Sequence, residues 1–401
     1  MYKYLIVFLS SIFTSCSLVS SIKISKAITE GHIKQTSFNR EIPFKQINGF
    51  IILTVSIEGQ QYDFLVDTGA PTVIDSDLAK KLKIKKLGNQ KVSDAYNKKK
   101  SLAYVKIKEI SIAELRFFET VAIVSDFSLI TKGLCLKVSG ILGANLMSRA
   151  IWQIDFAQSK INVADNRESL FIPEKSWNVD FRLYGGVGTP KFNLTVNNIL
   201  HEVILDTGSK WGITLLHTAK NQLLNPQEFV LGYGTVSGFL GNIVDTIRLA
   251  KIPLVKVGDS LEVKDEIVTF RDKIISDLVG NDFLKNYLVT IDWKNQSITF
   301  SLLNISSIKS FNSFGFKPTL SNNRLIIGFL YQESPAYKIG LRLNDTILKI
   351  NEWDFREVDQ SKYCDFIDSK LLENAENLSV LVSSEGKERT LQLIKTDLFS
   401  Q

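Results

Sequence analysis

Histidine and cysteine are scarce in this 401-residue chain, which contains three of each. None of the histidines stands in a metal-ligand spacing such as His-Glu-x-x-His, so we expect no metal ion and no cofactor. The histidines are His32, His201 and His217. The second of them, on a predicted strand, is expected to be a turn or surface residue. No Gly-x-Ser-x-Gly element, phosphate loop or dinucleotide fingerprint occurs either, which argues against the enzyme classes that use these motifs.

The cysteines are too few for a disulfide framework. Cys16 lies near the N-terminus, whereas Cys135 and Cys364 fall in different predicted modules, and no Cys-x-x-Cys pair is present. We therefore expect no structural disulfide. A chain that is exported without disulfides fits a bacterial origin better than a eukaryotic secretory route.

Long apolar runs are missing beyond the N-terminus, because no later segment reaches the roughly 20 apolar residues of a membrane span. Residues 1–16 contain Lys3, an apolar run and Cys16, and they resemble a bacterial lipoprotein signal. Cys16 would then be lipidated. The protein would be exported and anchored to a membrane of the bacterial cell envelope, at its periplasmic or outer-membrane face. An uncleaved anchor, whose apolar stretch extends to Ile22, and an ordinary cleaved signal are the alternatives.

A strong charge of one sign is also missing. The net charge is +6, and the lysines are scattered among acidic residues, with a modest cluster at residues 98–100. Aromatic residues are not interleaved with the basic ones, as they are on a nucleic-acid platform. We therefore expect no nucleic-acid partner.

One tripeptide occurs twice, as Asp67-Thr68-Gly69 and as Asp206-Thr207-Gly208, each time at the end of an apolar run. An apolar segment and a turn precede both runs, which predicts hairpins over residues 50–67 and 192–206. A single aspartate at the mouth of a buried strand is unfavourable, because burial disfavours its charged form. Two aspartates that meet can share one proton, so that one serves as a base and the other as an acid.

Further landmarks repeat in the same order. An apolar-apolar-Gly element follows each aspartate at nearly the same distance, as Ile141-Leu142-Gly143 and as Leu278-Val279-Gly280. An aspartate in a predicted terminal hairpin follows each of these glycines at an identical spacing, at Asp155 and Asp292. The order and spacing indicate an internal duplication with a period of about 139 residues.

These elements resemble the lobes of a retropepsin- or pepsin-type aspartyl protease. The resemblance implies a mainly β fold, in which duplicated lobes at residues 38–170 and 171–303 follow a linker at 17–37 and form one bilobal unit. Asp67 and Asp206 would be the catalytic dyad in the cleft between the lobes. The motif also implies supporting roles for Thr68, Thr207, Gly69, Gly208 and Ser209. In such enzymes the threonines brace the two loops by hydrogen bonds, the glycines allow tight turns, and the serine is able to bond its aspartate. The two apolar-apolar-Gly elements pack beneath the aspartate loops in these enzymes and support them.

The resemblance implies an aspartic endopeptidase, in which Asp67 and Asp206 activate a water against a peptide bond. Its partners would be protein or peptide substrates. Because one chain supplies both aspartates, the active unit would be a monomer. If the aspartates only cap their strands, the lobes are instead a catalytically silent scaffold in an envelope peptide-binding protein. An enzyme acting on a non-protein amide, such as a cell-wall peptide crosslink, is a further alternative.

Two hairpins are candidates for a flap that closes over substrate. Residues 233–241, which are rich in glycine, form the candidate in the second lobe, and the surroundings of Tyr96 form the one in the first. Glycines would give such a lid its mobility. An ordinary surface hairpin is the alternative in both places.

A polar linker at residues 304–311 separates the lobes from a segment of different character. Ser334-Pro335-Ala336 predicts a helix start, and residues 324–331 predict a strand. Residues 312–397 resemble a PDZ domain, a small α+β module. In that family a peptide end adds as a strand beside a groove, and Phe314-Gly315-Phe316 would form the loop that holds its carboxylate. A module that only packs on the lobes is the alternative.

Overall fold

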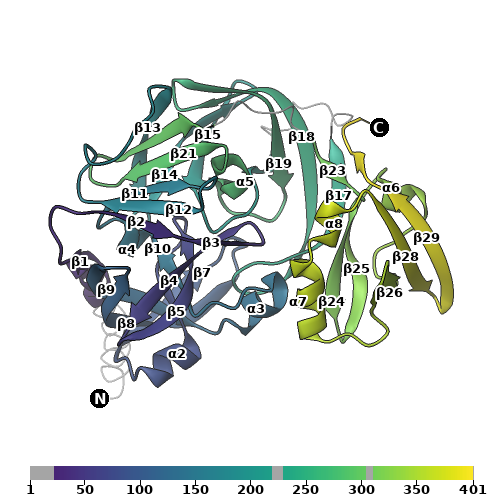
Figure 1. Ribbon diagram of the computed structural model, residues 1–401, viewed down its shortest axis with the longest axis horizontal. Coiled ribbons are helices and arrows are strands. Elements are labelled where there is room, and N and C mark those ends of the chain that lie inside the picture. The colour runs from purple at the N-terminus through teal and green to yellow at the C-terminus, as the bar shows by residue number, and fades with distance from the viewer. Residues whose placement is uncertain (1–21, 219–228, 304–309, 401) are drawn as a thin grey trace, which may run out of the picture.

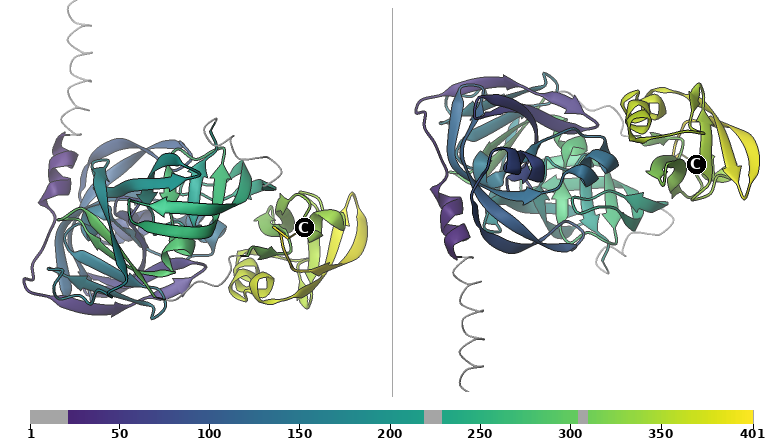
Figure 2. Two further views of the ribbon diagram at one scale, coloured as in Figure 1. Left: turned by 90° about the horizontal axis from the view of Figure 1, so that it is seen from above. Right: turned by 90° about the horizontal axis from the view of Figure 1, so that it is seen from below.

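The computed structural model describes residues 22–218, 229–303 and 310–400 (Figure 1). The chain is mainly β, as the sequence predicts, with 53% of its residues in strands and 13% in helices. Two β lobes lie side by side and a smaller module stands beside them, as the two views of Figure 2 also show. Cys16 and the rest of the expected signal lie outside the described residues. No helix in the described part of the chain is long and apolar enough to cross a membrane.

The first lobe is a closed sheet built around the hairpin that carries the first aspartate. β4 (Phe50–Ile57) and β5 (Gln60–Asp67) confirm the predicted hairpin, and Glu58 and Gly59 in its turn both have positive φ. This turn conformation matches the twist of the flanking strands. The other elements are β1 (His32–Ile33), β3 (Lys45–Ile47), β6 (Val73–Asp75), α2 (Ser76–Lys81), β7 (Lys86–Ser93), β8 (Lys99–Ile112), β9 (Leu115–Ser125), α3 (Ser128–Leu134), β10 (Gly140–Gly143) and α4 (Ala144–Met147). The strand order is β1-β9-β6-β10-β5-β4-β8-β7, and pairing of β8 with β9 closes the sheet.

The second lobe repeats the central pairings of the first. β14 (Thr189–Val196) and β15 (Ile199–Leu205) form its hairpin, with positive φ at Asn197 and Asn198. In both lobes the aspartate strand runs parallel to a short strand with the apolar-apolar element, β10 beside β5 and β20 (Asp277–Val279) beside β15. The remaining elements are β16 (Ile213–Leu216), β17 (Val230–Val236), β18 (Ile243–Val257), β19 (Leu261–Arg271) and α5 (Asn281–Leu284).

A sheet shared by both lobes holds them together. It contains β2 (Asn39–Pro43), β11 (Ile151–Asp155), β12 (Lys160–Ala164), β13 (Ser176–Tyr184), β21 (Tyr287–Asp292) and β22 (Ser297–Leu302). The strand order is β2-β12-β11-β21-β22-β13, so the two terminal hairpins pair at its centre. Across that centre, Gln153 Nε2 donates to Thr290 Oγ1 at 2.9 Å. One apolar cluster continues from the first lobe into the second, so the lobes share a core.

Residues 22–33 pack on the first lobe, although a linker was expected at 17–37. Residues 22–30 form a helix, in which Ile24 is 1% exposed. The backbone oxygen of Ile28 accepts a hydrogen bond from Arg149 Nη2 at 2.7 Å, and β1 pairs with β9. This segment is therefore part of the folded lobe.

The C-terminal module, residues 310–400, has its own apolar core. Its elements are β23 (Asn312–Ser313), β24 (Phe316–Ser321), β25 (Arg324–Tyr331), α6 (Pro335–Lys338), β26 (Thr346–Ile350), β27 (Trp353–Asp354), α7 (Gln360–Asp368), α8 (Leu371–Asn374), β28 (Asn377–Ser384), β29 (Lys387–Ile394) and β30 (Thr396–Asp397). β25 confirms the predicted strand, and α6 confirms the predicted helix start. Ser334 caps α6 because its Oγ accepts the N–H of Tyr337 at 3.3 Å, and Pro335 is the first helical residue.

The C-terminal module extends the sheet of the second lobe. β17 pairs antiparallel with β25, with Tyr233 opposite Leu330. The N–H of Gln332 also donates to the carbonyl of Leu231 at 2.7 Å. Gly232 permits the approach, because a methyl group there would lie 2.6 Å from the ring of Phe329. A strand of the predicted second-lobe flap is thus shared with the module.

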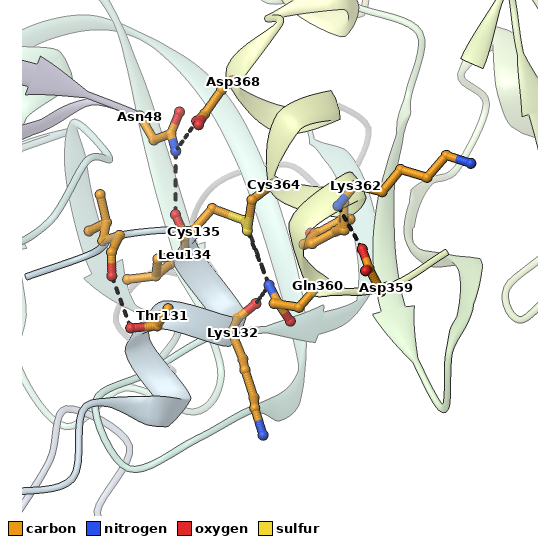
Figure 3. The surroundings of a disulfide bond; sticks show 12 residues. Asn48, Thr131, Lys132, Leu134, Cys135, Asp359, Gln360, Lys362, Cys364 and Asp368 are labelled. Atoms are coloured by element: carbon orange, nitrogen blue, oxygen red, sulfur yellow. Dashed lines mark hydrogen bonds between the residues drawn. A yellow bond between two sulfur atoms is a disulfide. The ribbon is translucent and has the colours of Figure 1, made fainter. Parts of the chain in front are cut away.

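A disulfide also joins the module to the first lobe (Figure 3). It links Cys135, at the end of α3, to Cys364 on α7. The expectation of no structural disulfide was therefore wrong. The cysteines do lie in different modules, as the sequence indicates, but packing brings α7 against α3. Beside the disulfide, Gln360 Nε2 donates to the carbonyl of Lys132 at 3.2 Å, and Asn48 Nδ2 donates to Asp368 Oδ1 at 3.3 Å.

Removing the disulfide is expected to destabilise the fold. The bridge joins residues 229 positions apart, and cross-links that close long loops typically contribute about 2–4 kcal/mol. Cys135→Ser/Cys364→Ser, in a protein that starts at residue 22, should therefore unfold at a lower temperature in oxidising buffer. Dithiothreitol should lower the melting temperature of the parent by a similar amount and leave the variant unchanged. Two free thiols in the denatured, unreduced parent would contradict this assignment.

Candidate active site

The two Asp-Thr-Gly loops meet where the lobes join. Asp67 ends β5 and Asp206 directly follows β15, so equivalent strands bring one aspartate from each lobe. A methyl group added to Gly69 would lie 2.9 Å from Asp206 Cγ, and one added to Gly208 would clash with Asp67 Oδ2. Glycine is required at both positions because the carboxyl group of the opposite lobe occupies the space of a side chain.

Thr68 and Thr207 cross-link the two loops. The N–H of Thr68 donates to Thr207 Oγ1 at 3.0 Å, and the N–H of Thr207 donates to Thr68 Oγ1 at 3.1 Å. The Thr68 hydroxyl donates in turn to the carbonyl of Leu205 at 2.6 Å, and the Thr207 hydroxyl to that of Val66 at 2.9 Å. Both threonines are fully buried. All four bonds cross between the lobes, so they fix the position of one aspartate relative to the other.

Thr207→Val is expected to lower the free energy of unfolding by about 2–4 kcal/mol, because it leaves two buried backbone groups without partners. These groups are the N–H of Thr68 and the carbonyl of Val66. Urea denaturation measures the change. Thr195→Val, on β14 and away from the loops, is the matched control and should change stability by less than about 0.5 kcal/mol. Equal losses in both variants would show that the cross-bonds do not stabilise the interface.

The apolar-apolar-Gly elements support the loops from beneath, as the sequence predicts. Gly143 lies opposite Asp67 in the parallel pairing of β10 with β5, and the N–H of Asp206 donates to the carbonyl of Val279 at 2.9 Å. Asn281, which the sequence reasoning did not single out, adds a further link. Its Nδ2 donates to the carbonyls of Thr207 at 2.8 Å and Gly49 at 2.9 Å. In the sequence, its position directly after Gly280 could have identified it as a residue that supports the loop.

The electrostatics of the aspartates are those of a coupled pair. Burial raises the pKa of the Asp67 carboxyl to about 6, although hydrogen bonds from Gly69, Asp206 and Ala70 favour its charged form. Burial, followed by the charge of Asp67 and a hydrogen bond with it, raises the pKa of Asp206 well above its usual value. The pair therefore holds one proton over a broad pH range, with Asp67 as the group that ionises first.

The tips of the β7–β8 and β17–β18 hairpins touch one another. Tyr96 Oη donates to the carbonyl of Ser237 at 3.3 Å, and Lys98 Nζ donates to that of Asn242 at 2.8 Å. Gly238 allows the close approach, because a methyl group there would clash with the ring of Tyr96. The two segments singled out as flap candidates thus form one bridge between the lobes.

The Phe314-Gly315-Phe316 loop packs within the C-terminal module and makes its contacts with residues of the same chain. Both phenylalanines are buried, and the N–H of Gly315 donates to Ser313 Oγ at 3.0 Å. Along the adjacent strand β24, Pro318 lacks an N–H, which removes one donor from the ladder that an added peptide strand would use. These contacts favour the packing alternative for this loop.

One sequence-based expectation for a single residue needs correction. His201 is not a turn or surface residue: it lies within β15, is 8% exposed, and its Nδ1 is 2.9 Å from Asp277 Oδ2. This pairing was invisible in the sequence because Asp277 lies on a neighbouring strand. Ser209 does bond its aspartate, because its backbone N–H donates to the Asp206 carboxyl group.

The comparison with known families agrees with this geometry. Residues 53–146, which contain the first Asp-Thr-Gly loop and its supporting element, match the family model described as aspartyl protease. No curated protein matches the chain. The first lobe therefore carries an aspartyl protease family domain, which points to an aspartic-type protease acting on protein or peptide substrates.

Proposed function

We propose that the protein is an aspartic endopeptidase whose active site is shared by the two lobes of one chain. A water between Asp67 and Asp206 loses a proton to the ionised Asp67 and attacks the carbonyl of the scissile peptide bond. Asp206, which keeps its proton at higher pH, donates it to the carbonyl oxygen as the tetrahedral intermediate forms. Acid–base assistance of this kind contributes about 10²–10⁴-fold, and positioning of the groups adds to it.

The observation that carries this proposal is the contact between the two aspartates, fixed by reciprocal threonine bonds. Two carboxyl groups buried together cannot both ionise easily, and their proton sharing is what acid–base catalysis needs. The dyads of aspartic proteases in general depend on the same coupling. A silent scaffold has no need for this pair, because buried carboxyl groups cost stability. The bridge of hairpin tips is proposed to be the lid over the cleft.

Cleavage of a diverse peptide mixture tests the proposal. The protein from residue 22 onward is incubated with the mixture between pH 4 and pH 8, and products are identified by mass spectrometry. Internal cleavage products, absent from boiled enzyme, are expected. If no peptide is cut at any pH, the silent scaffold becomes the better account of the fold. Cell-wall fragments are incubated in parallel, and cleavage of their amide crosslinks without cleavage of any peptide would favour the non-protein substrate.

We also propose a location in the bacterial cell envelope, with Cys16 as the lipidated residue. Labelling cells with an alkyne-tagged fatty acid tests this, because Cys16→Ser should abolish labelling of the full-length protein. For the C-terminal module, recognition of peptide C-termini at Phe314, Gly315 and Phe316 is the second candidate role beside packing. Tighter binding of a peptide with a free C-terminus than of its amidated form would support that role.

A further inference from the structure

Lys317 places a positive charge of the C-terminal module against the Asp206 loop. It lies on β24, and its Nζ is 4.0 Å from the ring centroid of Trp211 and 5.3 Å from that of Phe329. Trp211 follows Asp206 by five residues. Aromatic faces attract a cation but do not neutralise its charge. Within the described residues, no carboxylate lies within ion-pair distance of Lys317 Nζ.

Lys210 lies in the same loop, one residue before Trp211. It is exposed to solvent, yet the protein around it desolvates the ammonium group and lowers its pKa. Lys317 is also partly exposed, and desolvation, followed by the charges of Lys210 and Arg271, lowers its pKa well below the usual value. The two lysines therefore lie close enough to repel each other.

Few acidic residues act on the charges of these lysines. Two ion pairs lie nearby, Arg271 with Asp245 and Lys285 with Asp282, each with a nitrogen–oxygen distance of 2.8 Å. Glu373 on α8 is the remaining acid whose charge acts on Lys210. Of the acids whose charge acts on Lys210, Glu373 is thus the one without an ion-pair partner among the described residues.

We propose that Lys317 and Lys210 form a subsite that binds an acidic side chain of the peptide substrate. The inference rests on the proposed proteolytic function and names its substrate class: peptides with a glutamate or aspartate a few residues from the scissile bond. The carboxylate supplies the negative charge that the lysines lack and accepts charge-assisted hydrogen bonds. The C-terminal module thereby builds one wall of the substrate cleft, held in place by the disulfide and by the β17–β25 pairing.

The test compares peptides that differ only in one carboxylate. A cleaved peptide is made with Glu or Gln at each of three positions on either side of the scissile bond. At one position we expect kcat/KM for the Glu peptide to exceed that for the Gln peptide by about 10- to 100-fold. Lys317→Met should bring this ratio to within about twofold of one. Lys317→Arg should retain a preference, and Lys387→Met, at the exposed β28–β29 turn, should leave the ratio unchanged.

A binding measurement keeps the inference separate from catalysis. Fluorescein-labelled Glu and Gln peptides are titrated with Asp206→Asn protein, with and without Lys317→Met, and anisotropy is recorded. Tighter binding of a Glu peptide that depends on Lys317 supports the subsite even if no peptide is cleaved. No Glu preference at any position, a preference that survives Lys317→Met, or no measurable binding of any peptide would overturn it. Cleavage without a charge preference would overturn the subsite and leave the proposed function standing.

Discussion

Asp206→Asn is expected to lower kcat/KM by at least about 10³-fold while leaving peptide affinity almost unchanged. Asparagine keeps the size of the side chain but is not able to give up a proton to the developing oxyanion. The N–H of Gly208 donates to Asp206 Oδ1 at 2.9 Å, and an amide oxygen still accepts this bond. The loss should therefore appear in kcat, measured with a peptide identified in the cleavage mixture.

Asp63→Asn is the matched control for this prediction. Asp63 lies on β5, four residues before Asp67, and pairs with Lys45 at 2.8 Å on the surface. Its loss should change kcat/KM by less than about threefold, because exposed ion pairs contribute about 0–1 kcal/mol. Activity of Asp206→Asn within tenfold of the parent would remove Asp206 from the mechanism.

The activity is expected to rise with pH through about 6, in contrast to an acid optimum. Below a pKa of about 6, Asp67 gains a proton and the dyad holds two, so no base is left to activate water. Two pH units below this value about 1% of the enzyme is in the active form, and kcat/KM at pH 4 should be about 100-fold lower than at pH 7. At higher pH the rate should fall again as Asp206, whose pKa is raised further, loses its proton.

The pH profile is measured with a substrate that contains no acidic residue and no histidine, so that only the enzyme titrates. Circular dichroism at each pH checks that the fold is intact. A profile that is highest at pH 4 and declines above it would show that the environment of the aspartates does not raise their pKa values in solution. Because the two titrations are coupled, the apparent pKa values of the rising and falling parts of the profile describe the pair of aspartates and not either residue alone.

The fold of the lobes was predictable because local chemistry and the duplication point to the same structure. The turns at Glu58-Gly59 and at Asn197-Asn198 suit tight hairpins, and the apolar runs that follow them are buried strands ending in an aspartate. The repetition of these features made chance an unsatisfactory explanation. The meeting of Asp67 with Asp206 follows from the pairing of two equivalent lobes, which the spacing of the landmarks already indicated.

The contacts of the C-terminal module were not predictable from the sequence. The Cys135–Cys364 disulfide and the packing of Lys317 on Trp211 depend on how separate modules dock, and neither leaves a periodic or local pattern. Lys210 carried a weak signal, because it stands two residues after the second tripeptide. The position of Lys317 required the structure, since Trp211, beneath its ammonium group, belongs to the second lobe.

The central claim is that Asp67 and Asp206 act as one catalytic unit, and a double-mutant comparison tests it most directly. kcat/KM is measured for Asp67→Asn, Asp206→Asn and the doubly substituted protein, with one peptide at the pH optimum. If the pair shares one water and one proton, the double variant should lie within about threefold of the worse single variant. Losses that multiply, to about 10⁶-fold from two losses of 10³, would mean that the aspartates act independently and would contradict the shared dyad.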